Sequence, residues 1–455
     1  MQIKKNDCYI ITIEDMNESG EGVGKTDGYT LFVKDTVIGD VAEVKVIKAK
    51  KNYGYARLVK VVKPSVYRVE PVCKVARQCG GCQLQALRYE EQLRFKERKI
   101  KNNLERIGKF QGLDMEPIIG MEKPFRYRNK AQFPIGLNKD GEIVAGFYAG
   151  RTHSIIESDD CVIGAEVNYR ILDIVKGFMK EFGIAPYDEE RHFGVVRHVL
   201  IRVGYKTGQV MVCVIINGDK LDFGDRLVEK LLVIPGMTSI SFNVNKEKGN
   251  VILGHKIVNL YGDGYIFDYI GDVQYRISPL SFYQVNPMQT EKLYKVALEY
   301  AGLSGNEVVW DLYCGIGTIS LFLAQQAKQV YGVEIVADAI RDARENARLN
   351  GMENVEFFVG KAEEVLPKMY ERERVYAEVI VVDPPRKGCE QAVLDTMVEM
   401  GPERIVYVSC DSATLARDLR YLCDRGYEVG NVQGVDMFGM TGCVECVCLM
   451  TRKEK

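Results

Sequence analysis

The sequence predicts a multi-domain α/β protein with a small OB-like β-barrel first, an α+β domain in the middle and a doubly wound, Rossmann-like α/β domain at the C-terminus. Three observations lead to this expectation. Short alternating strands broken by glycine turns begin the chain, a cysteine-rich segment with further strands follows, and strand–helix units fill the last part. A length of 455 residues, 46% of them hydrophobic, suits about three cored domains, which we place at residues 1–62, 63–270 and 271–455.

The first domain carries its positive charge in one stretch. Eight lysines and arginines and no acidic residue lie between Lys45 and Arg68, interleaved with Tyr53, Tyr55 and Tyr67. A basic surface with aromatic platforms suits single-stranded RNA, because unstacked bases can stack on the rings. Taken alone, such a charge run is more often a solvated face. The net charge of the whole chain is only −2, so any attraction to nucleic acid is local.

Four of the thirteen cysteines suggest a metal centre in the second domain. Cys73, Cys79 and Cys82 lie close together in a glycine-containing segment, and Cys161 is the candidate for a fourth ligand. Four thiolates fit tetrahedral zinc or an iron–sulfur cluster, and the spacing does not choose between them. Unrelated thiols are the alternative, which applies most to Cys161.

An amphipathic helix is expected after the first three of these cysteines, over residues 89–108. Leu93, Ile100, Leu104 and Ile107 recur at helical spacing, and Gly108 follows at the end. We expect the charged residues of this helix to form a solvated face. Alternating strands are predicted over residues 195–205 and 209–218, which makes the middle domain α+β.

The third domain contains a glycine-rich turn between a strand and a helix. After Asp311 the chain passes through Gly315 and Gly317, where a backbone turning against a ligand cannot carry side chains. Glu334 ends the next strand, at about the spacing at which a carboxylate holds a ribose diol. The loop lacks the third glycine of a nicotinamide fingerprint, and it contains neither Gly-Lys-Ser nor Gly-Lys-Thr. It resembles the S-adenosylmethionine loop of class I methyltransferases.

Two further strand ends carry reactive side chains. Asp383 precedes two prolines that stiffen its turn, and Cys410 lies between a strand and a helix. Because ligands of an open α/β sheet bind outside the carboxyl ends of its strands, Cys410 is a candidate nucleophile. Beside a methyl donor, a thiolate that adds to carbon 6 of a pyrimidine turns the ring into an enolate, whose carbon 5 can attack the methyl group.

This chemistry needs a base that removes the carbon-5 proton before the cysteine leaves. All four histidines lie before residue 271, so we expect a carboxylate. Glu445 is a lone charge in an apolar strand pattern, where desolvation would raise its pKa toward a useful value. From this feature alone, a half-exposed strand glutamate is the more common interpretation.

Five motifs in one order resemble those of the bacterial TRAM-containing RNA uracil-5-methyltransferases. They are SFYQVN at 281–286, DLYCGIGT at 311–318, DPPRKG at 383–388, SCDSATLARD at 409–418 and DMFGMTGCVE at 436–445. The resemblance implies a TRAM barrel, a class I methyltransferase domain, Cys410 as nucleophile and Glu445 as base. It implies S-adenosylmethionine contacts from Gln284, Tyr313, Thr318, Glu334 and Asp383. It also implies a [4Fe–4S] cluster held by Cys73, Cys79, Cys82 and Cys161.

Two positions depart from the pattern of this family. The family usually has proline where this chain has Ser412, and it commonly has histidine where this chain has Cys443. The first departure could loosen the loop beside the nucleophile, and the second could alter the pKa of the base.

The resemblance also leads to a substrate and a location. Transfer-RNA enzymes with this chemistry generally lack both a TRAM module and a cysteine cluster, so we expect 23S ribosomal RNA as the partner, with transfer RNA as the alternative. DNA, a membrane and a protein partner are not expected. No apolar stretch approaches the roughly 18 residues of a membrane span, and the N-terminus lacks a signal-peptide pattern, which predicts a cytoplasmic protein.

Other classes of protein fit the sequence less well. A non-catalytic RNA-binding or RNA-folding protein would not need Cys410, Glu445 and the whole cofactor loop. An iron–sulfur redox or radical enzyme is disfavoured because the motif C-x3-C-x2-C is absent. Cytosine methylation is chemically close, but the Ser-Cys-Asp-Ser setting of the cysteine resembles the uracil enzymes.

Overall fold

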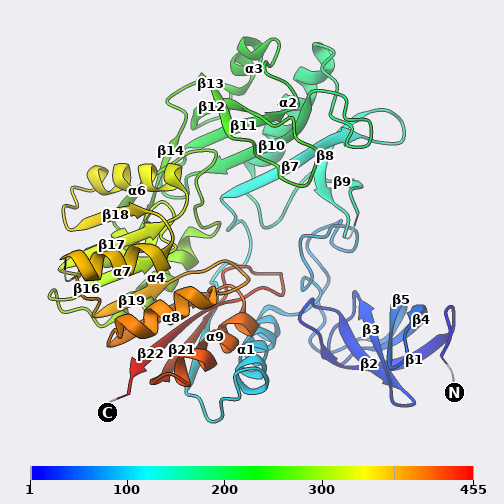
Figure 1. The fold of residues 1–455 in the computed structure, drawn as a ribbon. Helices are drawn as coiled ribbons and strands as arrows, with labels where there is room; N and C mark the ends of the chain where they lie inside the picture. The colour runs from blue at the N-terminus through cyan, green and yellow to red at the C-terminus, as the bar shows by residue number, and fades with distance from the viewer. Residues whose placement is uncertain (1–2, 151, 374, 454–455) are drawn as a thin grey trace.

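A closed β-barrel and three sheets organise the chain, which Figure 1 colours from blue at the N-terminus to red at the C-terminus. The structure is a computed structural model and describes residues 3–150, 152–373 and 375–453. Within these ranges, no helix is long and apolar enough to cross a membrane.

The first domain is the predicted barrel. Its strands are β1 (Cys8–Met16), β2 (Gly22–Thr26), β3 (Tyr29–Lys34), β4 (Val41–Ala49) and β5 (Tyr53–Lys63). They pair in the order β1-β2-β3-β5-β4, and β4 closes the barrel on β1. Because successive side chains of a strand point to opposite faces, Ile11, Leu31 and Val44 fill the interior.

The middle domain is a mixed sheet with helices on one face. Its sheet has the order β13-β12-β11-β10-β7-β8-β9. The strands are β7 (Lys130–Leu137), β8 (Ile143–Tyr148), β9 (Ile155–Glu157), β10 (Val196–Val203), β11 (Val210–Ile216), β12 (Met237–Val244) and β13 (Lys256–Tyr261), and the helices are α2 (Val167–Glu181) and α3 (Gly224–Leu231). The helices cover the face that carries Val199, while Leu200 and Met211 join the core of the third domain. Strands β10 and β11 are buried on both faces, which explains their continuous apolar sequence.

The third domain is the predicted doubly wound sheet, with the order β18-β17-β16-β19-β20-β22-β21-β6. Its strands are β16 (Val308–Leu312), β17 (Gln329–Glu334), β18 (Val355–Val359), β19 (Val379–Val382), β20 (Arg404–Ser409), β21 (Tyr427–Val435) and β22 (Glu445–Arg452). Its helices are α4 (Pro287–Ala301), α5 (Thr318–Ala324), α6 (Ala337–Leu349), α7 (Ala362–Glu373), α8 (Gln391–Met400) and α9 (Ser412–Cys423). The strand order reverses between β16 and β19, and a ligand crevice is expected at such a reversal.

The third sheet also takes in residues that we had assigned to the middle domain. Strand β6 (Met115–Ile119) pairs in parallel with β21. Helix α1 (Tyr89–Arg106) packs against α9, and the two helices lie side by side in Figure 1. A five-residue strand does not indicate locally which sheet it will extend. The expected boundary at residues 270–271 falls in the turn of a hairpin, β14 (Ile266–Ile270) and β15 (Val273–Ile277), that packs in the core of the third domain.

Candidate active site

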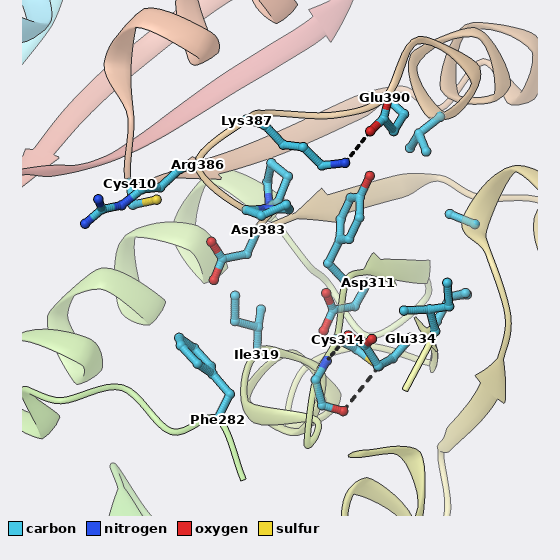
Figure 2. Close-up of a pocket in the computed structure, with 18 of the residues that line it drawn as sticks. Phe282, Asp311, Cys314, Ile319, Glu334, Asp383, Arg386, Lys387, Glu390 and Cys410 are labelled. Carbon is cyan, nitrogen blue, oxygen red and sulfur yellow. Dashed lines mark hydrogen bonds and ion pairs between the residues drawn. The ribbon is translucent and has the colours of Figure 1, made fainter. Parts of the chain in front are cut away.

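One cavity of about 1100 Å³ at the third sheet collects all the predicted catalytic and cofactor residues (Figure 2). It is lined by Gln284, Tyr313, Thr318, Glu334, Asp383, Cys410 and Glu445. These side chains come from the turns that follow β16, β19 and β20, from the ends of β17 and β22, and from the segment before α4. The fold therefore brings together residues that are far apart in the sequence.

The glycine-rich turn between β16 and α5 adopts backbone conformations that few side chains tolerate. Gly315 has a φ of 55° and Gly317 a φ of 80°, and Tyr313 has a φ of 72° although it carries a side chain. A Cβ atom on Gly317 would lie 2.9 Å from the ring of Phe357. Non-glycine residues in the left-handed region are uncommon, and such strain gathers at ligand sites.

Two carboxyl groups face the cavity, one from β16 and one from the end of β17. Backbone amides hold Glu334, because its Oε1 accepts from Val336 at 3.0 Å and its Oε2 accepts from Gly315 at 3.3 Å. Asp311 is 1% exposed, and burial raises its pKa to about 7. Ser320 donates to its Oδ2, whereas its Oδ1 has no hydrogen-bond partner in the described part of the chain. This oxygen is available to a donor on a ligand.

Cys410 lies in a turn that local hydrogen bonds fix. Asp411 caps helix α9, because its Oδ1 accepts from the amides of Ala413 at 2.9 Å and Thr414 at 3.1 Å. The hydroxyl of Ser409 donates to the carbonyl of Asp411 at 3.0 Å. Cys410, which lines the cavity, lies beside Arg386 (Figure 2).

The antiparallel register of β22 against β20 places Glu445 beside this turn. Ser409 pairs with Cys446, so the residue after Ser409 and the residue before Cys446 meet at the same edge of the sheet. Glu445 also pairs with Val435 on β21 and is only 4% exposed. It is therefore a buried carboxyl group rather than a half-exposed strand glutamate.

Burial dominates the electrostatics of the cavity. It raises the pKa of Asp383 and of Glu445, and the charge of Asp383 raises the pKa of Glu445 further while Arg386 lowers it. Burial also raises the pKa of the Cys410 thiol to about 12, with smaller contributions from Glu445 and Asp383 that Arg386 opposes. The protein alone thus keeps this thiol protonated, and a cation bound nearby would favour the thiolate.

The cavity wall also contains residues outside the predicted set, among them Asp311, Phe282 and Arg386. Phe282 is 67% exposed and lies across the cavity from Asp383 (Figure 2). The sequence signal for all three was their position inside the motifs at 311–318, 281–286 and 383–388.

Both departures from the family pattern have defined surroundings. Ser412 is 1% exposed, and its hydroxyl accepts a hydrogen bond from Asn103 at 2.9 Å, so the turn is held at this residue without a proline. Cys443 lines the cavity together with Glu445, and its amide donates to Thr441 at 3.2 Å.

The four cysteines of the middle region line a second cavity of about 430 Å³. They are Cys73, Cys79, Cys82 and Cys161, and all thirteen cysteines of the chain are free thiols. Among the residues that the structure describes, no group of three or more histidine, cysteine, aspartate or glutamate side chains is arranged to hold a metal ion. The fold therefore gathers the quartet around one space without forming a metal centre.

Comparisons with known proteins agree with this architecture. The TRAM domain model matches residues 5–59, and the tRNA (Uracil-5-)-methyltransferase model matches residues 269–453. An uncharacterised RNA methyltransferase of Halalkalibacterium halodurans is 52% identical, with 99% of this chain and 98% of the relative covered. A Bacillus cereus RNA methyltransferase, also uncharacterised, is 50% identical, with 100% of this chain and 98% of that protein covered.

A solved structure is similar over nearly the whole chain. It is the Pyrococcus abyssi tRNA (uracil-54, C5)-methyltransferase in complex with S-adenosyl-L-homocysteine, with a TM-score of 0.77 and 27% identity, covering 98% of this chain and 100% of that one. This protein belongs to the RNA methyltransferase family of these relatives, and its third domain is of the uracil-5-methyltransferase type. The family and the fold that the sequence predicted are therefore confirmed.

Alkylation by iodoacetamide tests the charge coupling at Cys410 directly. The rate at Cys410 should rise with pH, because only the thiolate reacts and the pKa is raised. Above the raised pKa of Glu445, Glu445→Gln should speed the reaction because it removes a negative charge, and below that pKa it should change little. Peptide mass spectrometry measures the rate, with the exposed Cys8 as internal reference. Equal rates in both proteins at high pH would contradict the coupling.

Proposed function

We propose that this protein methylates carbon 5 of a uridine in RNA, with S-adenosylmethionine as the methyl donor and Cys410 as a covalent nucleophile. The observation that carries the proposal is the pairing of β20 with β22, which brings Cys410 and Glu445 together in the cavity that also contains the glycine-rich turn. A buried carboxyl group of raised pKa beside a thiol suits proton removal from an adduct.

The residues of the chain act in a fixed order. Cys410, which is partly exposed, loses its proton to solvent, and its thiolate adds to carbon 6 of the uracil. Carbon 5 of the resulting enolate attacks the methyl carbon of the donor, and the bond from that carbon to the sulfonium sulfur breaks, which leaves S-adenosylhomocysteine. Glu445 then removes the proton from carbon 5, the double bond between carbons 5 and 6 returns, and the carbon–sulfur bond breaks to release the cysteine.

The cavity fits the proposed donor. Bound S-adenosylmethionine supplies an electrophilic methyl group on a sulfonium centre. Glu334, held by backbone amides at the end of β17, is placed for the ribose hydroxyls, and the turn at Gly315 and Gly317 lets the backbone approach closely. We assign further contacts to Gln284, Tyr313, Thr318 and Asp383. The likeness to the Pyrococcus enzyme solved with S-adenosyl-L-homocysteine supports this assignment.

RNA that contains 5-fluorouridine should trap the covalent adduct, because fluorine replaces the proton that the base must remove. The wild-type protein with S-adenosylmethionine should give a complex that resists denaturation, and Cys410→Ala should give none. Gel electrophoresis with labelled RNA measures the complex.

The same assay with ordinary RNA tests Glu445. Glu445→Gln should accumulate the methylated adduct, with turnover reduced by about a hundredfold or more because the base is absent. Cys423→Ala, a partly exposed thiol of the same domain outside the cavity, is the matched control and should behave as wild type. A stable adduct with Cys410→Ala, or rapid release by Glu445→Gln, would refute the assigned roles.

We further propose a [4Fe–4S] cluster held by Cys73, Cys79, Cys82 and Cys161. Four free thiols around one cavity match the ligand set of such a cluster, and Arg128 in the same wall suits a centre of net negative charge. These ligands would join the loop before α1, which carries Cys73, Cys79 and Cys82, to Cys161 of the middle domain. Tetrahedral zinc is the competing occupant.

Anaerobic purification distinguishes the two metals. The protein should be brown, with about four irons and four sulfides per chain, and Cys82→Ala should lose the colour. Elemental analysis and sulfide determination measure the content. Stoichiometric zinc without sulfide would exclude the cluster.

The proposed RNA is 23S ribosomal RNA, gripped at single-stranded segments by the barrel. Phe32, Tyr53 and Tyr55 form an aromatic cluster on its outer face, with ring centroids 5.7 to 5.9 Å apart. Register places Lys48 opposite Tyr55 and Lys45 opposite Arg57, so cations flank the rings. Tyr67, which we had expected among these aromatic residues, packs instead against a separate core.

Transfer RNA is the second candidate substrate. The Pyrococcus abyssi enzyme is a tRNA (uracil-54, C5)-methyltransferase and is similar over 98% of this chain, so a barrel and a middle domain do not by themselves separate the two RNA classes. Methyl transfer to protein-free 23S RNA and to unmodified tRNA, compared side by side, decides between them.

The barrel surface should control RNA affinity and its salt dependence. Replacing Lys48 and Arg57 by glutamine should weaken binding and reduce the slope of log K against log salt by up to about two, because each lost phosphate contact removes about one. Lys25→Gln, at an exposed ion pair with Glu14, is the control. Fluorescence anisotropy measures binding, and S-adenosylhomocysteine affinity should not change. An unaltered salt slope would exclude this face from RNA binding.

A further inference from the structure

Helix α1 carries a polar stripe that faces the catalytic domain. Tyr89, Gln92, Lys96, Lys99 and Asn103 follow one another at spacings of three and four residues, which places them on one face of the helix. We had expected a solvated face. Instead Gln92 is 1% exposed, Lys96 is fully buried and Asn103 is 8% exposed. The stripe lies outside both matched family models, which cover residues 5–59 and 269–453.

The first part of the stripe binds the segment 436–442, which leads into Glu445. Lys96 Nζ donates to Asp436 Oδ1 at 2.5 Å and to the carbonyl of Phe438 at 3.0 Å, and Tyr89 donates to Asp436 Oδ2 at 2.7 Å. Both members of the Lys96–Asp436 ion pair are completely buried. The charge pair therefore fixes the start of the segment.

Two more residues of the stripe continue along the same segment. Gln92 Oε1 accepts from the amide of Met440 at 3.0 Å, and Lys99 donates to the carbonyl of Gly442 at 3.1 Å. Phe438 and Cys443, at the middle and just beyond the end of the segment, line the active-site cavity. Helix α1 thus holds the backbone up to three residues before Glu445.

The last residue of the stripe binds the other catalytic turn. Asn103 Nδ2 donates to Ser412 Oγ at 2.9 Å, two residues beyond Cys410. Ser412 is the first residue of α9, where the family usually has proline. A proline restricts this position through its ring, whereas here a hydrogen bond from α1 restricts it.

We propose that α1 is a positioning element for catalysis, in which Lys96, through Asp436, sets the location of Glu445 and Asn103, through Ser412, sets the location of Cys410. One rigid helix then fixes the base and the nucleophile relative to each other. The proposal rests on the proposed function. Lys96 would then serve proton removal by Glu445, and Asn103 would serve adduct formation by Cys410.

The test separates those steps in single-turnover experiments with the full-length protein. Formation of the 5-fluorouridine adduct reports on Cys410, and the lifetime of the methylated adduct with ordinary RNA reports on Glu445. Asn103→Ala should slow adduct formation by about tenfold or more and leave the lifetime unchanged, because a displaced nucleophile loses rate steeply. Adding Ser412→Pro to Asn103→Ala should restore the rate, since proline is favourable at the first position of a helix.

The contact of Lys96 with Asp436 should show the opposite pattern. Lys96→Met combined with Asp436→Asn removes both charges, so that no unpaired charge is left buried. This double variant should prolong the methylated adduct by about tenfold or more, as Glu445→Gln does, with adduct formation little changed. Lys101→Met, on an exposed side chain of the same helix, is the matched control for both rates.

Three outcomes would overturn the proposal. Unchanged rates in both variants would show that α1 does not position either group. A parallel loss of both rates and of thermal stability, without rescue by Ser412→Pro, would show that the stripe only supports the fold. If the wild-type protein itself formed no adduct and no 5-methyluridine, the proposed function would fail first, and this inference with it.

Discussion

The pairing of β22 between β20 and β21 is the constraint on which the candidate site depends. Parallel βα units alone would place Asp383 and Cys410 at one edge of the sheet, but they would supply no group from a strand that begins there. Because β22 runs antiparallel to β20, its first residue, Glu445, lies beside the turn that ends β20. A one-residue slip of this register would turn Glu445 to the opposite face of the sheet and take it out of the cavity. The chemistry thus depends on register as much as on residue identity.

Burial determines the pKa values of the ionisable groups in the cavity. It also disfavours the thiolate form of Cys410, which the proposed mechanism requires. Asp383, Glu445 and Cys410 share a cavity in which desolvation raises every one of their pKa values. A raised carboxyl pKa suits a base that must later give up its proton, whereas a raised thiol pKa opposes formation of the nucleophile. Arg386 offsets only part of this effect. In the proposed mechanism, binding of a positively charged donor would therefore favour formation of the Cys410 thiolate.

The sequence alone was sufficient to predict the cavity residues that lie in short local motifs. The predicted residues from Gln284 to Glu445 all line one cavity, and most of them lie at or next to the end of a strand or helix that the sequence pattern predicts. The sequence was insufficient to predict contacts between residues that are far apart in the chain. The pattern of α1 showed an apolar face at Ile100 and Leu104, but the burial of Lys96 depends on Asp436, 340 residues away. In the same way, a five-residue strand such as β6 joins the third sheet only because β21 leaves an edge open. The cysteine quartet is intermediate, since the sequence predicted which cysteines line one cavity, whereas the fold alone does not determine whether they hold a metal.

The buried polar stripe of α1 forms hydrogen bonds with the backbone of segment 436–442, and the needs of that backbone explain the stripe. Segment 436–442 is irregular and inside the protein, so its carbonyl and amide groups need partners that no sheet ladder supplies. Leaving one such group unpaired costs about 1–3 kcal/mol. Helix α1 supplies partners to three of these backbone groups, which are the carbonyl of Phe438, the amide of Met440 and the carbonyl of Gly442. A buried ion pair such as Lys96–Asp436 is a poor source of stability, because desolvation offsets most of the attraction, but it tolerates little displacement once formed. Such a pair suits an irregular segment that leads into Glu445, because the proposed base would have to be positioned precisely against one carbon atom.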